Sequence, residues 1–181
     1  MCTATGTETG TGTPTGTGIT VSAATHPANS LAPQGASRVP FTKITLTNNS
    51  GAAVTVNGIT VERTGLGADS AFSGVVLVDD TNLQVGISKT LNSNHQATVG
   101  DTFTLNAGET KTLTVAGNMA ASLASYAGQV VGLTVVAVNT TATVAGSLPI
   151  SGAQHTVNAT LTLGSVSTST SAYDPGAAQT K

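Results

Sequence analysis

Residues 130–138 read VVGLTVVAV and form the most apolar run of the chain. Valine fills five of these nine positions, and a side chain branched at Cβ suits a pleated sheet better than a helix. The run is also much shorter than the ~18 apolar residues that a membrane-spanning helix needs. It therefore predicts the central strand of a sheet.

The composition of the other residues also favours an all-β protein. Thr is the commonest of the 181 residues, whereas the helix formers Glu, Lys, Arg and Met are scarce. Only 8% of the residues are charged and the net charge is −2, which excludes the basic surface of a nucleic-acid-binding protein. Because a surface hydrated by hydroxyl groups is typical of secreted and surface-displayed β modules, we expect an extracellular or cell-surface location.

Short alternating segments separated by turn residues predict further strands. The expected strands are Ile19–Val21, Val39–Thr47, Val54–Val56, Ile59–Arg63, Val75–Val78, Leu83–Ile87 and His155–Leu163. Pro40 interrupts the alternation of its segment and indicates an edge or a bulge. Two segments, Phe103–Leu105 and Thr110–Val115, flank the turn residues 106–108 and predict a hairpin. Met119–Tyr126 is expected to form one helical turn, and the whole pattern predicts a β-sandwich.

The chain divides into three parts by composition. Residues 1–18 are a Thr/Gly tract with almost no apolar side chains, which predicts either a linker or a segment that donates a strand to a neighbour. Residues 19–164 are expected to form the sandwich. Residues 165–181 are expected to form an extended tail, and the sequence around Val166 resembles the first expected strand closely enough to suggest the start of a second module.

Three stretches of the chain resemble modules of repetitive bacterial surface-layer-like and extracellular fibre proteins. They are GITVERTGLGADSAFSGVVLVDD (58–80), LNAGETKTLTVAGNMAA (105–121) and GSLPISGAQHTV (146–157). The resemblance implies an immunoglobulin-like antiparallel β-sandwich that is either strung together with others or polymerised. Because the chain holds little more than one module, self-assembly or a fragment of a longer protein is favoured over a long tandem array.

No sequence motif points to catalysis. The chain has no G-x-S-x-G, S-x-x-K, Walker A or H-E-x-x-H sequence. We expect His26, His95 and His155 to lie in loops or on a sheet face rather than to be parts of an active site. The protein is therefore predicted not to be an enzyme and to need no cofactor.

The densest group of side-chain oxygens follows the strand that ends near Val78. Asp79, Asp80 and Asn82 fit either a structural calcium site or a solvated turn, and Asp69 or Asp101 is a candidate for completing a site. Glu62 and Arg63 alternate along a strand and are not expected to pair.

Two kinds of modification fit the sequence. Asn48, Asn139 and Asn158 each begin an N-x-S/T sequence and are candidate glycosylation sites, although about this many sequons are expected by chance. Cys2 fits a lipoprotein-like start, a disulfide between subunits or an incidental thiol. One Cys excludes an internal disulfide framework.

These observations favour a structural subunit of a filament or surface layer. The edge of a sandwich accepts an extended peptide from another chain, so the terminal segments would join identical subunits into a head-to-tail homopolymer. Ile19, Val21 and Val166 are the expected strand-donor residues. The alternative is a cell-surface module that binds glycans, although Trp is absent and the Phe residues are needed for the core.

Overall fold

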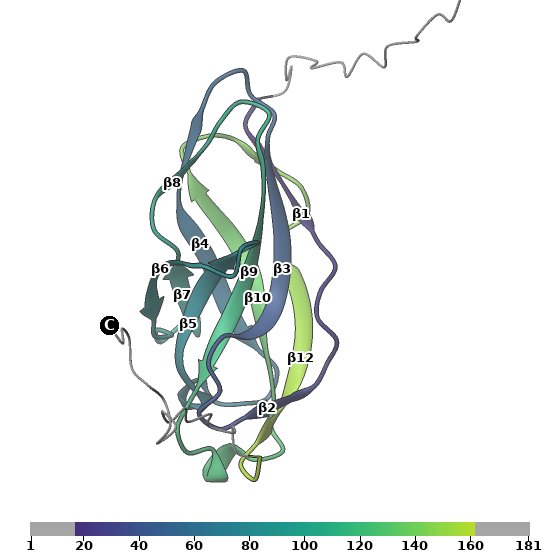
Figure 1. Cartoon of the computed structure of the whole chain (residues 1–181), viewed down its shortest axis with the longest axis vertical. Coiled ribbons are helices and arrows are strands. Elements are labelled where there is room, and N and C mark those ends of the chain that lie inside the picture. The colour runs from purple at the N-terminus through teal and green to yellow at the C-terminus, as the bar shows by residue number, and fades with distance from the viewer. Residues whose placement is uncertain (1–16, 162–181) are drawn as a thin grey trace, which may run out of the picture.

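The computed structural model describes residues 17–161 and shows an all-β protein built from two packed sheets (Figure 1). Its helical segments are two single 3₁₀ turns, η1 (Asp69–Ala71) and η2 (Ala124–Tyr126). The predicted tail at 165–181 and nearly all of the Thr/Gly tract at 1–18 lie outside the described residues. The expected sandwich is confirmed at this level, and η2 falls inside the segment predicted to form a helical turn.

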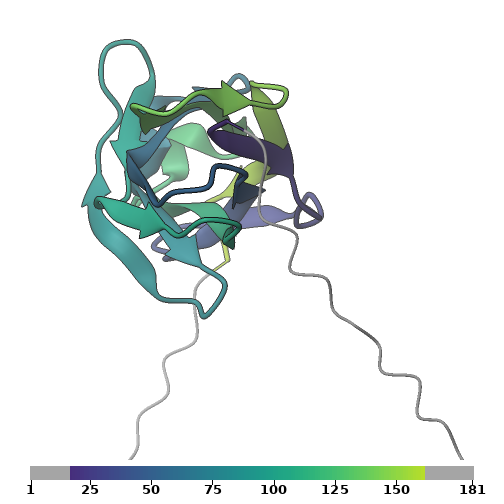
Figure 2. The ribbon, with the colours of Figure 1, turned by 90° about the horizontal axis from the view of Figure 1, so that it is seen from above.

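Each sheet has six strands. Sheet A has the order β11-β1-β3-β9-β5-β6. Its strands span Val144–Ala145, Ile19–Ala23, Val39–Asn48, Thr110–Met119, Phe72–Asp79 and Gln84–Lys89 in that order. Sheet B has the order β2-β12-β10-β4-β7, and β8 also pairs with β4. Its strands span Leu31–Pro33, Ile150–Asn158, Val130–Thr140, Val54–Thr64, Gln96–Val99 and Phe103–Leu105. One of the two sheets curls into a half-barrel, so that the strands surround the core when the molecule is viewed from its end (Figure 2).

Both sheets are mixed, so the expectation of a purely antiparallel sandwich is wrong. β1 pairs with β11 in parallel, and β2 pairs with β12 in parallel. The cause is the path of the N-terminal part of the chain. β1 runs antiparallel to β3 in sheet A, and the chain then crosses to the other layer, where β2 lies at the edge of sheet B.

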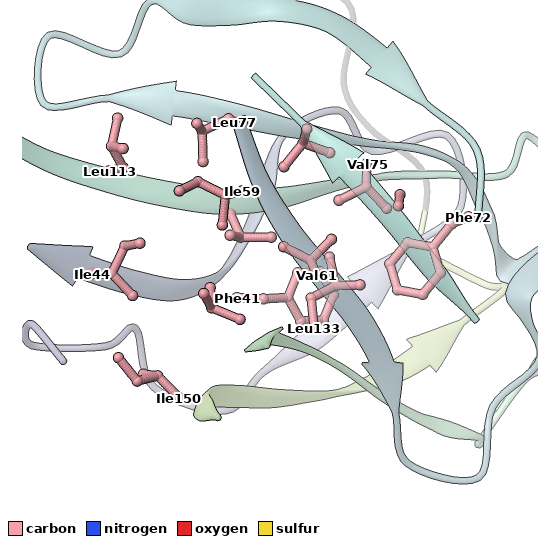
Figure 3. Packing of buried hydrophobic residues seen from close by; sticks show 14 of the residues in the cluster. Phe41, Ile44, Ile59, Val61, Phe72, Val75, Leu77, Leu113, Leu133 and Ile150 are labelled. Carbon is pink, nitrogen blue, oxygen red and sulfur yellow. The ribbon is translucent and has the colours of Figure 1, made fainter. Parts of the chain in front are cut away.

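The apolar run 130–138 lies at the centre of sheet B, as predicted. It forms most of β10, which is flanked by β12 on one side and by β4 on the other. Side chains that point between the sheets make one continuous core, in which Phe41, Leu77 and Leu133 are almost completely buried (Figure 3). The rings of Phe41 and Phe72 lie 5.6 Å apart in a tilted arrangement within this core.

The predicted hairpin at 103–115 is wrong, although its turn is real. The turn is closed by a bond from the Glu109 N–H to the Asn106 carbonyl. The strand before it, β8, pairs with β4 in sheet B, whereas the strand after it, β9, lies between β3 and β5 in sheet A. The turn therefore carries the chain from one sheet to the other.

Several strand boundaries also differ from the prediction. Residues Asn57 and Gly58 lie inside one long strand, β4, where Gly58 has a φ of +116° at a shift in register. β12 begins at Ile150, five residues earlier than expected. The expected irregularity at Pro40 is a bulge in the pairing of β3 with β9. The short strands β2, β7 and β11 were not predicted.

The two ends of the described chain lie at opposite ends of the sandwich (Figure 1). β1 begins beside the turn that follows β3, where Ile19 pairs with Asn48. The last strand, β12, ends beside β2, where Asn158 pairs with Pro33. The chain thus enters at one end of the sandwich and leaves at the other.

Candidate functional site

The feature of the described residues that best fits binding of another chain is an open groove along the outer edge of β1. It has a volume of about 570 Å³. One wall is β1 from Thr20 to Ala23, and the other is the segment from Gly146 to Ser151 that leads into β12. No charged side chain is among the residues that line it. The groove therefore suits an uncharged segment with small side chains.

Main-chain groups of β1 are directed into this groove. The N–H of Ala24 donates to the carbonyl of Lys43 on β3 at 2.9 Å. Because successive residues of a strand direct their main-chain groups to opposite sides, the N–H and C=O of Ala23 point away from β3. Ala23 is exposed and is among the residues that line the groove. This part of β1 is an edge at which a further strand can add.

β11 covers only the first part of that edge. Its two residues pair with Ile19 and Thr20. Gly146 follows at once and lies so close to β1 that a Cβ there would come within 2.0 Å of the Val21 carbonyl oxygen. Beyond Gly146 the chain leaves β1, and the groove opens.

The structure places two of the predicted strand-donor residues in the chain's own core. Ile19 is 0% exposed and Val21 is 1% exposed, and both point between the sheets. To act as donors, they must leave this position and occupy the same one in another copy. Val166 lies outside the described residues.

The predicted calcium ligands form a turn. Asp79 Oδ1 accepts bonds from the Thr81 N–H and hydroxyl and from the Leu83 N–H. The hydrogen bond from the Thr81 hydroxyl is the main reason that the pKa of Asp79 lies below its ordinary value. Asp80 is exposed, and Asn82 adopts a φ of +65°. Within residues 17–161, no three His, Cys, Asp or Glu side chains come together as a metal site.

Asp69, which was a candidate for completing the calcium site, belongs to a different cluster. It forms an ion pair with Arg63, and its Oδ2 lies 2.6 Å from His95 Nδ1. Partial burial opposes ionisation of this carboxyl group, but the hydrogen bonds with His95 and Arg63 and their charges outweigh it, so the pKa of Asp69 is lowered. No local sequence pattern indicates this cluster, because its three members come from separate segments. Glu62 does not pair with Arg63, as expected, and accepts a bond from Gln96.

His155 lies in strand β12, on the face that points into the core. It is 1% exposed, and its ring meets the Phe41 ring edge-on at a centroid distance of 4.6 Å. Nδ1 accepts the Ser30 N–H at 3.0 Å, which leaves the proton on Nε2 to be donated to the Pro40 carbonyl at 2.9 Å. This histidine therefore joins β12, β3 and the start of β2.

Burial also corrects one of the three predicted glycosylation sites. Asn48 is 0% exposed, and its Nδ2 donates to the carbonyls of Ala52, Leu105 and Asn106. A glycan on that nitrogen is incompatible with this folded arrangement. Asn139 and Asn158 are half-buried. Cys2 lies outside the described residues.

Comparison with protein-family models found no match for this chain, and comparison with curated protein sequences found none either. Among residues 17–161, no helix has the length and apolar character to cross a membrane.

Proposed function

We propose that the protein is a structural subunit of an extracellular surface assembly, a filament or a surface layer, whose copies join head to tail by exchanging terminal β-strands. The observation that carries this proposal is the position of β1. It is a short strand near the start of the chain and lies close to the edge of its sheet, yet its side chains complete the core.

The way in which β1 is held favours its exchange. It forms five residue pairs with β3 and only two with β11. Residues 24–30 connect it to β2 in the other sheet, and this connection includes Pro27. If β1 leaves, β3 keeps β9 but loses its other neighbouring strand, and the core loses Ile19 and Val21. The β1 strand of a second copy restores both, because it makes the same contacts.

The C-terminal segment is a poor replacement for β1. When Val166 takes the place of Val21, the residue two positions earlier, Gly164, falls at the place of Ile19. The space that Ile19 fills would then be empty, at a cost of roughly 2–5 kcal/mol. The best occupant of the β1 position is therefore another β1.

Two further observations agree with an extended extracellular assembly. The described chain begins and ends at opposite ends of the sandwich, as head-to-tail stacking requires (Figure 1). The outer faces also carry paired threonine hydroxyls. Those of Thr47 and Thr110 lie 3.0 Å apart, and those of Thr60 and Thr98 lie 3.3 Å apart. Such pairs stabilise a sheet without surface charge.

The strand order supports the finer proposal of an immunoglobulin-like topology. If the strands β1, β3, β4, β5, β9, β10 and β12 are lettered A to G, sheet A contains the order ABED and sheet B contains GFC. This is the order of constant-type immunoglobulin domains. The other five strands, β2, β6, β7, β8 and β11, are additions to that arrangement.

A pair of engineered cysteines tests the exchange of β1. Ser22 and Thr45 face each other in the β1–β3 register, at a separation of about 5.5 Å between Cα atoms that allows a disulfide. In a Cys2→Ser background, Ser22→Cys with Thr45→Cys is expected to give covalent oligomers on oxidation. The control pair Thr45→Cys with Thr112→Cys joins β3 to β9, which remain in one chain, and is expected to give cross-linked monomers.

Negative-stain microscopy shows whether ordered assemblies form, and non-reducing electrophoresis shows whether the disulfide joins different chains. A chain that forms no ordered assembly at any concentration overturns the structural role. Assemblies in which the Ser22–Thr45 disulfide closes only within single chains overturn the exchange of β1.

The alternative of a glycan-binding module receives less support. Sugar-binding surfaces often use exposed aromatic rings. Among the described residues, Phe41 and Phe72 are buried, and Phe103 and Tyr126 are half-buried. Saturable binding on a glycan array by the full chain would favour this alternative.

A further inference from the structure

The exchange of β1 does not fill the groove beside β1, so the groove remains available to bind another segment. Whether β1 comes from the same chain or from a neighbour, the outward N–H and C=O of Ala23 lie along the groove. We infer that this groove binds residues 163–168 of a second copy, which add as a further strand beside β1. This inference deepens the proposed function and rests on it.

The chemistry of the segment matches that of the groove. Residues 163–168 read LGSVST. They carry no charge, and apart from Leu163 and Val166 they have only small or hydroxyl side chains. The groove is lined by Val21, Ile150 and Pro149 together with serine, threonine, alanine and glycine residues. When a strand adds to a sheet edge, main-chain hydrogen bonds supply much of the affinity, so one or two apolar side chains are enough to fix the register.

The length of the chain favours a second copy over the same one. Leu161 is held beside Asn158, because its N–H donates to Asn158 Oδ1 at 2.7 Å. The nearest groove residue on β12 is Ser151, seven residues before Asn158, which is about 23 Å along a strand. Five residues separate Val166 from Leu161, and even fully extended they span only about 17 Å. Val166 therefore cannot reach the groove of its own sandwich.

A neighbour stacked head to tail removes this obstacle. The described chain leaves the sandwich at the end where β12 stops, whereas β1, which lines the groove, starts at the opposite end (Figure 1). In a head-to-tail stack, the C-terminal segment of one copy leaves next to the groove of the following copy. A single repeated contact of this kind is heterologous and propagates.

Disulfide trapping between two full-length proteins tests the inference. One protein carries Cys2→Ser with Ala23→Cys, and the other carries Cys2→Ser with Ser165→Cys or Ser167→Cys. Different affinity tags identify the mixed product. We expect the mixed disulfide to form at least ten-fold more with these partners than with two matched controls. The donor control is Thr180→Cys, and the acceptor control is Ser125→Cys in η2.

A proline substitution tests the main-chain contact. Ala23→Pro removes an N–H that points away from β3, and edge strands tolerate such a change. It is expected to leave the Tm within a few degrees and to reduce trapping between Ser147→Cys and Ser167→Cys at least ten-fold. Ser22→Pro is the matched control, because Ser22 directs its N–H toward β3 and its loss weakens the β1–β3 ladder and lowers the Tm.

The outcomes separate this inference from the proposed function. If the Ser22–Thr45 pair links different copies but Ala23→Cys traps no C-terminal segment, the groove inference is overturned and the exchange of β1 stands. If a double variant with Ala23→Cys and Ser167→Cys closes only within monomers, the inference is also overturned. If neither cysteine pair links copies, both proposals are overturned.

Discussion

The Nε2 atom of His155 on β12 lies 2.9 Å from the carbonyl oxygen of Pro40 on β3, so a histidine from one sheet is bonded to the backbone of the other. Thr42 makes a second link of this kind, because its buried hydroxyl donates to the Leu133 carbonyl on β10. Buried polar groups are costly unless they are paired. These two links therefore fix how the sheets are positioned against each other.

Replacing His155 with leucine should destabilise the domain by about 2–3 kcal/mol, because the Ser30 N–H and the Pro40 carbonyl would lose their partner in the interior. Urea unfolding followed by circular dichroism measures the change. The control is His95→Leu, whose side chain is half exposed, with an expected loss of less than about 1 kcal/mol. Equal losses for the two variants would contradict a structural role for the buried histidine.

Gly152 should not tolerate even an alanine. A Cβ at this position would lie 2.2 Å from the Phe41 carbonyl oxygen, a backbone atom that cannot move aside on its own. Gly152→Ala is expected to cost about 2–3 kcal/mol, since overpacking forces the strands apart. The matched variant Gly51→Ala adds a methyl group where no atom lies within 4 Å, and its stability should change by less than about 0.5 kcal/mol. A thermal melt of each variant compares them.

Asp69 should make stability depend on pH in the acid range. Its pKa is lower in the folded protein than in the unfolded chain, so its stabilising contribution is complete above about pH 4. The contribution is lost as the pH falls through the folded-state pKa. Asp69→Asn should therefore lose about 1 kcal/mol at pH 7 and almost nothing at strongly acid pH. The control is Asp80→Asn at an exposed position, whose stability at pH 7 should change by less than about 0.5 kcal/mol. An equal loss at both pH values would contradict this account.

Asn48 should behave as a structural residue and not as a glycan acceptor. Asn48→Ala leaves the carbonyls of Ala52, Leu105 and Asn106 without this donor and should cost about 2–3 kcal/mol. Peptide mapping of material from a host that glycosylates N-x-S/T sequences should find Asn48 unmodified in folded protein. A glycan at Asn48 in protein with an unchanged Tm would contradict the buried position.

The central strand and the class of fold could be predicted because they depend on local pattern. The valine-rich run 130–138 has the composition of a buried strand in any context. The disruption of alternation at Pro40 is likewise a local property, because proline has no N–H to donate to the neighbouring strand. Both appear in the structure as expected.

Strand pairing was harder to predict because it depends on distant residues. The turn before Glu109 shows that the chain reverses, but not that β8 and β9 then join different sheets. The strands β2, β7 and β11 are only two to four residues long. Such short segments are strands only because a longer neighbour is present to pair with them.

The candidate site was predictable in part. The apolar character of Ile19 and Val21 marked them as important, and the structure explains this by burial. No pattern in the sequence predicts the groove, because its residues Ala23, Gly146 and Ser151 are brought together only by the fold. The same holds for His155, whose buried position depends on Ser30 and Pro40.

The two ends of the described chain, residues 17 and 161, lie at opposite ends of the sandwich, and this arrangement has a mechanical consequence (Figure 1). A pulling force applied between these two residues acts parallel to β1, so it loads the five β1–β3 residue pairs together, in shear. Hydrogen bonds loaded in this way must break at nearly the same time, whereas hydrogen bonds pulled at right angles to the strands break one after another. A string of such subunits would resist stretching most strongly along its own length.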